Sequence, residues 1–277
     1  MKKHNHQYFT KIWHEKPSSI NPYQTAQIFV HGYNLVDQIL QNATIEEYHG
    51  LLYSEKKLNQ HQVLIYKDLQ LLLAHLGPRN LGVRAAMNAG VGGGTPASAL
   101  ISSISILAGT HGGAKEVYYL VDLIYQCKND LSILLNSILS LYHNNKDQET
   151  NLFDHPFGFE SEFDETSPIN LDIIVHLIQK HDIPLLKQIF SQLKTIELQF
   201  QGGISLTFIF AILYYYLDFP PESAEMNFLI SHLHGSAAHA IEQKKQGLAQ
   251  FPFLVGMIAN QNDVEIKEKI NLKDFGI

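Results

Sequence analysis

Apolar residues recur at intervals of three and four along most of this chain. This spacing places them on one face of an α-helix, and none of the long runs that follow it is interrupted by proline. The runs cover residues 64–76, 97–109, 115–127, 131–143, 171–181 and 204–217. The alternation of apolar and polar residues that indicates a strand is rare, and residues 26–34 are its best example. The pattern therefore predicts an all-α protein.

Capping signals support the helical prediction. Thr44 is followed three residues later by Glu47, which is the spacing of a capping box. Thr95 precedes Pro96, and proline is favoured at the first position of a helix. The segment 219–226 begins another helix with its two prolines.

One long acidic segment, residues 143–170, has no helical period. We expect it to be a loop over a cleft or a hinge. It divides the chain into a large helical domain at 1–150, a small helical domain with the cleft loop at 151–203, and the return of the large domain at 204–277.

The composition excludes several classes of protein. Of the 277 residues, 45% are hydrophobic and 17% are charged, which is typical of a globular chain with a full core. The net charge is −7 and no basic cluster is denser than two adjacent lysines, so nucleic-acid binding is not expected. No apolar run reaches the roughly 18 residues of a membrane helix, and the first residues lack the apolar core of a signal peptide. We expect a cytoplasmic protein without membrane contact.

Histidine and cysteine spacing gives no metal signature. Cys127 is the only cysteine, and it has no partner at a recognisable spacing. His232, His234 and His239 do not form a helical metal pair, although His239 remains a candidate for lining a site. The glycine-rich run 90–98 lacks the ending of a phosphate-binding loop and is explained by a tight corner between helices.

The stretch "LAGTHGGAKEV" at residues 107–117 surrounds His111 with glycines. Glycine costs a helix interior about 1 kcal/mol relative to alanine, so these glycines require a reason. If a helix begins just after His111, its free backbone N–H groups point at whatever the imidazole contacts, and Gly112 and Gly113 allow close approach. A positive helix end also favours a neutral imidazole, which can donate a hydrogen bond to an enolate oxygen. A packing corner is the alternative.

Several segments, in order along nearly the whole chain, resemble the citrate synthase family. Residues 29–62 are similar to the start of that fold, and 83–90 are similar to its arginine-bearing helix, with Arg84. Residues 106–117 resemble the family's catalytic turn "LSGPLHGGANEAV", and 217–243 resemble a later helix. The resemblance implies a citrate synthase-like fold, with a large helical domain and a smaller helical insertion domain. It also implies a homodimer, whose interface we assign to the helices predicted at 97–109 and 115–127.

The resemblance also implies a reaction. In the family, the histidine that matches His111 hydrogen-bonds the thioester oxygen of an acyl-CoA as it becomes an enol. An aspartate removes the α-proton, and a second histidine activates a 2-oxo acid. The implied substrates are an acyl-CoA and a 2-oxo acid, with no other cofactor and no metal.

Other positions depart from the family pattern. Gln201 replaces the aspartate, and a neutral amide does not accept a proton usefully near pH 7. Glu160 or Ser161 stands where the second histidine is expected, and the family's carboxylate-binding arginines are missing. The candidate catalytic residues are His111, Gln201, Glu160 and Ser161. The candidate substrate-binding residues are His75, Arg79, Arg84, Gly112, Gly113 and His239.

Two functions therefore stay open. The first is an enzyme, an acyltransferase or a citryl-CoA lyase-type lyase, in which a carboxylate of the long loop replaces the missing base; the loop also carries His155. The second is an inactive homologue that acts as a CoA-binding or regulatory subunit. A carboxylate beside His111 favours the enzyme. Filling of that space by one of the nearby phenylalanines, Phe157, Phe159, Phe163 or Phe200, favours the regulatory subunit.

Overall fold

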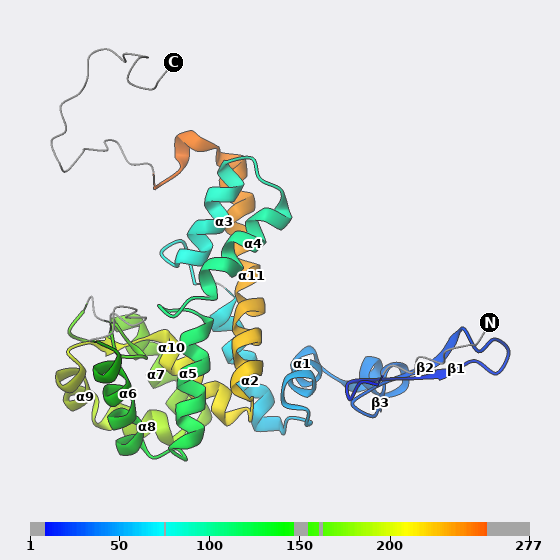
Figure 1. Cartoon of the computed structure of the whole chain (residues 1–277), viewed down its shortest axis with the longest axis horizontal. Helices are drawn as coiled ribbons and strands as arrows, with labels where there is room; N and C mark the ends of the chain where they lie inside the picture. Colours follow the sequence, from blue (N-terminus) through cyan, green and yellow to red (C-terminus); the bar gives the residue numbers. More distant parts are fainter. Residues whose placement is uncertain (1–8, 75, 147–154, 161–162, 254–277) are drawn as a thin grey trace, which may run out of the picture.

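The computed structural model describes residues 9–74, 76–146, 155–160 and 163–253, and it is mostly helical (Figure 1). The first elements are β1 (Trp13–Pro17), β2 (Thr25–Val30), β3 (Tyr33–Asn34), the π-helix η1 (Leu35–Leu40), α1 (Ile45–Ser54), α2 (Gln60–Leu73), α3 (Leu81–Val91), α4 (Pro96–Leu107) and α5 (Ala114–Gln126). They are followed by α6 (Leu131–Lys146), β4 (Phe159–Glu160), α7 (Pro168–His181), α8 (Pro184–Ser191), α9 (Leu193–Phe200), β5 (Gly203–Ile204), α10 (Leu206–Tyr216), α11 (Pro221–Gln246) and the 3₁₀ turn η2 (Leu248–Gln250).

The periodic runs of the sequence form α2, α4, α5, α6, α7 and α10, so the all-α prediction is confirmed. Thr44 caps α1 with the expected box, in which its side chain and that of Glu47 each accept a backbone N–H of the other residue. Thr95 caps α4, with Pro96 at the first helical position. The strand expected at 26–34 forms most of β2 and β3, and β1 completes an antiparallel sheet in the order β1-β2-β3.

Helices α5 to α10 gather into one lobe, and α11 runs away from it beside α3 and α4 (Figure 1). The centre of the lobe is apolar, because α5 buries Leu120 and Ile124 against α10, which buries Phe208 and Ile212. Every residue of α10 from 207 to 214 is buried, which explains its continuously apolar sequence.

Helices α7 and α8, which follow the predicted loop in the sequence, belong to the same core. Ile174 and Leu177 of α7 and Ile189 of α8 are fully buried in the cluster that contains Leu120. Helix α8 contacts both α6 and α10. The division into domains at 1–150, 151–203 and 204–277 remains a prediction.

Helices α3, α4 and α11 pack closely, which accounts for Gly90, the first residue of the glycine-rich run. A Cβ on Gly90 of α3 would lie 2.5 Å from the carbonyl oxygen of Ala240 on α11. Ser103 of α4 is fully buried and its hydroxyl lies 2.7 Å from that of Ser236 on α11. These small residues serve contact between helices of one chain.

The interface assigned to helices 97–109 and 115–127 needs one correction. Helix α5 buries its apolar residues inside the protomer, from Val117 to Ile124, so its apolar face is not available to a partner. Helix α4 does expose apolar side chains, among them Ile101 and Ile106. In the described part of the chain, no helix is both long and apolar enough to cross a membrane.

Candidate active site

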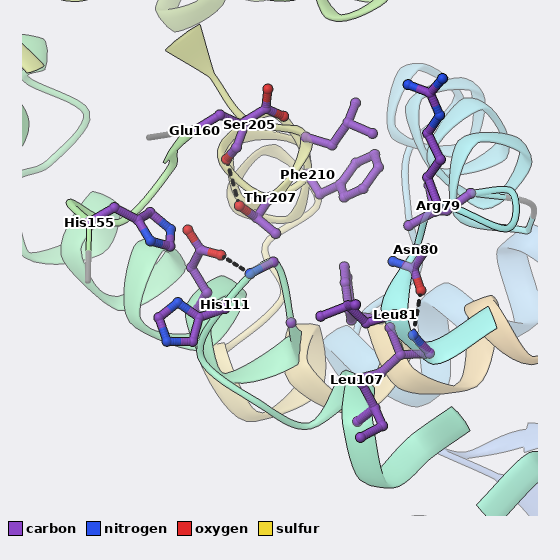
Figure 2. A pocket seen from close by; sticks show the side chains of 18 of the residues that line it. Arg79, Asn80, Leu81, Leu107, His111, His155, Glu160, Ser205, Thr207 and Phe210 are labelled. Atoms are coloured by element: carbon purple, nitrogen blue, oxygen red, sulfur yellow. Dashed lines mark hydrogen bonds between the residues drawn. The ribbon is translucent and has the colours of Figure 1, made fainter. Parts of the chain in front are cut away.

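A cavity of about 550 Å³ opens beside His111, where the starts of α3, α5 and α10 meet the end of α4 and strand β4. Its wall contains acidic, imidazole and apolar side chains together (Figure 2). The lining residues are Leu76, Arg79, Asn80, Leu81, Gly82, Ile106, Leu107, His111, Gly112, Gly113, Glu116, His155, Phe159, Glu160, Phe163, Ser205, Leu206, Thr207, Phe210 and Phe228.

His111 lies in the turn between α4 and α5, and its side chain is exposed to the cavity. Gly112 adopts the left-handed conformation, with φ at +62°, which a residue with a side chain rarely adopts. A Cβ on Gly113 would collide with the carbonyl oxygens of Leu107 and Gly109 at the end of α4. Helix α5 begins directly after Gly113, as the sequence predicted. The two glycines therefore allow the sharp turn that carries the imidazole to the cavity.

A second imidazole lies next to the first. The ring centres of His111 and His155 are 5.2 Å apart, and both rings line the cavity on the same side (Figure 2). His155 precedes β4, so this part of the acidic segment lies beside the turn before α5.

Glu116, in the first turn of α5, is the most buried carboxylate of the wall, with 1% of its surface exposed. One oxygen accepts the N–H of Gly112 at 2.8 Å and the other accepts the N–H of Gly158 at 2.7 Å. Burial raises the pKa of Glu116 to about 7, and the charge of Glu160 also raises it. These two hydrogen bonds and one with Thr207 lower the pKa and offset part of the effect. A carboxyl group with a pKa near 7 exchanges protons readily at neutral pH.

Glu160 reaches the cavity from β4, which pairs with β5 so that Glu160 faces Gly203. Its Oε1 accepts a hydrogen bond of 3.3 Å from the side-chain amide of Asn170. A side chain at position 203 would collide with the backbone of Glu165 and Thr166, which explains the glycine there. Glu160 is only partly buried, so one carboxylate of the wall is sealed and the other is accessible.

Two hydroxyl groups and a guanidinium group also line the cavity. Ser205 caps α10, and its Oγ lies 2.7 Å from Oγ1 of Thr207. Arg79 lies across the cavity from His111, next to Asn80, whose side chain caps α3 (Figure 2). The guanidinium of Arg79 is exposed at the rim.

The structure thus brings together His111, Gly112, Gly113, Glu160 and Arg79 among the predicted residues. Gln201 is exposed at the end of α9 in a left-handed conformation and is not part of the wall. Beyond Gln201 the chain passes through Gly202 into β5, and Ser205 and Thr207 then line the cavity. His75 and Ser161 lie outside the described residues.

Arg84 and His239 also lie away from this wall. The guanidinium of Arg84 sits 4.1 Å above the ring of Phe253, and Nδ1 of His239 lies 3.5 Å from a carboxylate oxygen of Glu242. Neither residue lines this cavity, and the substrate contact of each stays a prediction.

Sequence reasoning overlooked Glu116, Ser205 and Thr207. Glu116 stands in the same "HGGAKEV" stretch as His111, five residues later, and a carboxylate in the first turn of a helix was the available signal. Ser205 carried the signal of a helix cap ahead of the apolar run that begins at 206.

No group of three or more potential metal ligands occurs in the described residues. His232, for which the sequence gave no metal signature, is buried and donates from Nδ1 to the carbonyl oxygen of Phe228 at 2.7 Å. Burial lowers its pKa to about 4, against this hydrogen bond. Its role is packing.

Solved structures with the same fold include three enzymes. Citryl-CoA lyase from Hydrogenobacter thermophilus matches over 95% of this chain and 96% of its own, with a TM-score of 0.63 and 14% identity. ATP citrate lyase from Methanothrix soehngenii, solved with citrate and coenzyme A, matches 94% of this chain and 43% of its own, with a TM-score of 0.62 and 15% identity. A variant of Methanosaeta concilii ATP citrate lyase, solved with (3S)-citryl-CoA, gives a TM-score of 0.63, 15% identity and the same coverage.

No protein-family model and no curated protein matches the chain by sequence. At 14% to 15% identity the structural matches show the fold alone. The resemblance to the citrate synthase family is confirmed at that level: the chain has the fold of citryl-CoA lyase, which is citrate synthase-like.

Proposed function

We propose that this protein makes or cleaves a C–C bond next to the carbonyl of an acyl-CoA thioester. The observation that carries the proposal is the cavity in which His111 and His155 stand beside two carboxylates, Glu116 and Glu160. Because an α-proton is a very weak acid, its removal requires a base and a donor that stabilises the enolate oxygen at the same time. This wall supplies both kinds of group.

Each group has a defined part in the proposal. His111 donates a hydrogen bond to the thioester oxygen as the enol forms. Glu160 takes the α-proton, since it is the accessible carboxylate, and His155 exchanges a proton with the oxygen of the second carbonyl. Glu116 is a positioning residue, because both of its oxygens are used to hold backbone N–H groups of the wall. Gly112 and Gly113 keep the approach to His111 open.

Two observations support coenzyme A as part of the ligand. Two of the structural neighbours were solved with CoA or a CoA thioester bound. Arg79 is positioned at the rim to pair with an anionic group of such a ligand. The proposed assembly is a homodimer, in which exposed apolar residues of α4 and α11 such as Ile101 and Ile241 become covered.

The alternative is a catalytically inactive homologue that binds CoA or regulates a partner. The position of Gln201 favours the inactive homologue. Gln201 is the residue that matches the family's base, and it does not line the cavity. The open space beside His111 favours the enzyme. Phe157 and Phe200 are buried outside the wall, and Phe159 and Phe163 line the cavity without closing it.

The test is the exchange of α-protons of acetyl-CoA with solvent deuterium, followed by mass spectrometry of the thioester. We expect exchange with the native protein and its loss in His111→Ala. His234→Ala removes an exposed imidazole away from the cavity and is the matched control. The stability of His111→Ala should stay within about 1–2 kcal/mol of native, since the side chain is exposed. Binding of acetyl-CoA in a calorimeter without any exchange would favour the regulatory alternative.

A further inference from the structure

The described residues that line this cavity carry few positive charges. Arg79 is the one arginine or lysine among the described lining residues. The whole chain contains only two arginines, and the other, Arg84, packs on Phe253 outside the wall. A second copy of the chain would bring the same two arginines again. Arginine often holds a carboxylate through two hydrogen bonds, and among the described lining residues a substrate with several carboxylates finds one such partner.

One accessible carboxylate, that of Glu160, faces the cavity, and the sealed Glu116 lies close to it. Glu116 and Glu160 both line the cavity, and they lie close enough for the charge of one to raise the pKa of the other. A carboxylate of a bound 2-oxo acid would stand near these groups in a partly desolvated space, where like charges weaken binding.

Much of the remaining wall is apolar. Leu81, Ile106 and Phe163 line the cavity with 56%, 48% and 58% of their surfaces exposed. Phe159 and Phe210 line it from deeper positions, almost fully buried. Exposed apolar side chains around a concave site gain free energy when a ligand covers them.

We propose that the second substrate is an uncharged aldehyde or ketone with an apolar side chain. This inference rests on the proposed function and names the substrate class of the same cavity. Glu160 takes the α-proton of the acyl-CoA, and the electron pair of that C–H bond forms the enol. The enol carbon then bonds to the carbonyl carbon as the electron pair of the C=O bond moves to its oxygen, and this oxygen takes a proton from His155. The proton held by Glu160 returns to His155 through solvent, which restores both groups. The product is a 3-hydroxyacyl-CoA, formed by addition with no other reactant, and cleavage is the reverse.

The experiment uses the full chain with acetyl-CoA and a series of straight-chain aldehydes, and with oxaloacetate as the anionic comparison. Products are identified by mass spectrometry. We expect 3-hydroxyacyl-CoA from the aldehydes, with KM falling about three- to fourfold for each added methylene that the apolar wall buries. We expect kcat/KM for oxaloacetate to be at least about tenfold lower, the effect of one unfavourable charge contact.

A pair of variants tests the apolar wall. Phe163→Ser should flatten the dependence of KM on aldehyde length, whereas Phe190→Ser, which changes a half-exposed phenylalanine of α8 outside the cavity, should leave it intact. Equal dependence on length in both variants would overturn the role of the wall.

The outcomes separate the inference from the proposed function. Product from oxaloacetate with a kcat/KM equal to or above that of the best aldehyde overturns the inference and leaves the function standing. If acetyl-CoA exchanges its α-protons but no uncharged carbonyl compound gives a product, the inference is again overturned and the proposed function stands. No proton exchange at all overturns the proposed function, and the inference with it.

Discussion

Glu116 accepts the backbone N–H of Gly158 at 2.7 Å, although 42 residues of sequence separate them. Its other oxygen accepts the N–H of Gly112, next to His111. One buried carboxyl group therefore connects the turn that carries His111 to the segment that carries His155 and Glu160. The two imidazoles, whose ring centres are 5.2 Å apart, lie on the two segments that Glu116 connects.

The connection predicts a pH dependence of stability. The pKa of Glu116 is about 7 in the folded protein, because of burial, against 4.5 as its ordinary value. As the pH rises from about 4.5 to 7, the unfolded chain releases this proton before the folded chain does, so the folded state loses stability. Below about pH 4.5 this loss of stability is absent. Above about pH 7 it is complete, and it then lowers the free energy of unfolding by about 3 kcal/mol.

Urea unfolding of the native protein and of Glu116→Gln across this range measures the effect. The free energy of unfolding of the native protein should fall more steeply with pH, since the glutamine does not titrate. Glu222→Gln, at an exposed position of α11, should keep the native slope. Identical slopes for all three proteins would show that Glu116 has an ordinary pKa.

The fold was largely predictable because its helices bury one face each and begin at recognisable caps. Thr44, Thr95 and the period of the long runs placed most helices near their observed bounds. Helix α9 was harder to predict, because its eight residues include few buried positions: Ile196, Glu197 and Phe200. Gln201 is the residue that ends this helix, and it lies outside the cavity wall.

The site was predictable only where one local motif carried it. His111, Gly112 and Gly113 are adjacent in sequence, and their conformation follows from the glycines. The contact between Glu116 and Gly158 depends on packing of distant segments, and no local pattern specifies it. The burial that shifts the pKa of Glu116 has the same origin.

Gly113→Ala tests the steric reason for the glycine next to the site. The added Cβ would lie 2.7 Å from the carbonyl oxygen of Leu107 and closer still to that of Gly109, and both are backbone atoms that cannot rotate away. We expect a loss of about 2 kcal/mol of stability and a larger relative loss of proton exchange. Gly109→Ala, whose Cβ has one neighbour at 3.3 Å, should be milder in a thermal melt. Equal melting temperatures for the two variants would contradict the steric argument.

Ile101→Asp tests the homodimer. Ile101 on α4 has 63% of its surface exposed in the single chain, and a charge at a covered apolar contact opposes association. The native protein should sediment as a dimer and the variant as a monomer. Leu198→Asp, on α9 with 81% exposure, should sediment like the native protein. A native protein that sediments as a monomer at all concentrations would exclude the proposed assembly.

Asp68→Ala tests an ion pair that holds α7 against α2. Lys180 and His181, the last two residues of α7, each place a nitrogen 2.7 Å from a different oxygen of Asp68. Burial would raise the pKa of Asp68, but these hydrogen bonds outweigh it and hold the pKa below 3.8. The stabilisation is therefore present above about pH 4 and is lost as the pH falls through the lowered pKa.

Removal of Asp68 leaves a lysine and a buried histidine without their carboxylate, so we expect a loss of about 3 kcal/mol at neutral pH. Asp172→Ala removes an exposed carboxylate of the same helix α7 and should cost less than about 0.5 kcal/mol. Urea unfolding of both variants decides the matter, and the difference between them should shrink in acid, where Asp68 is protonated. A difference that persists unchanged in acid would mean that Asp68 acts through packing rather than through its charge.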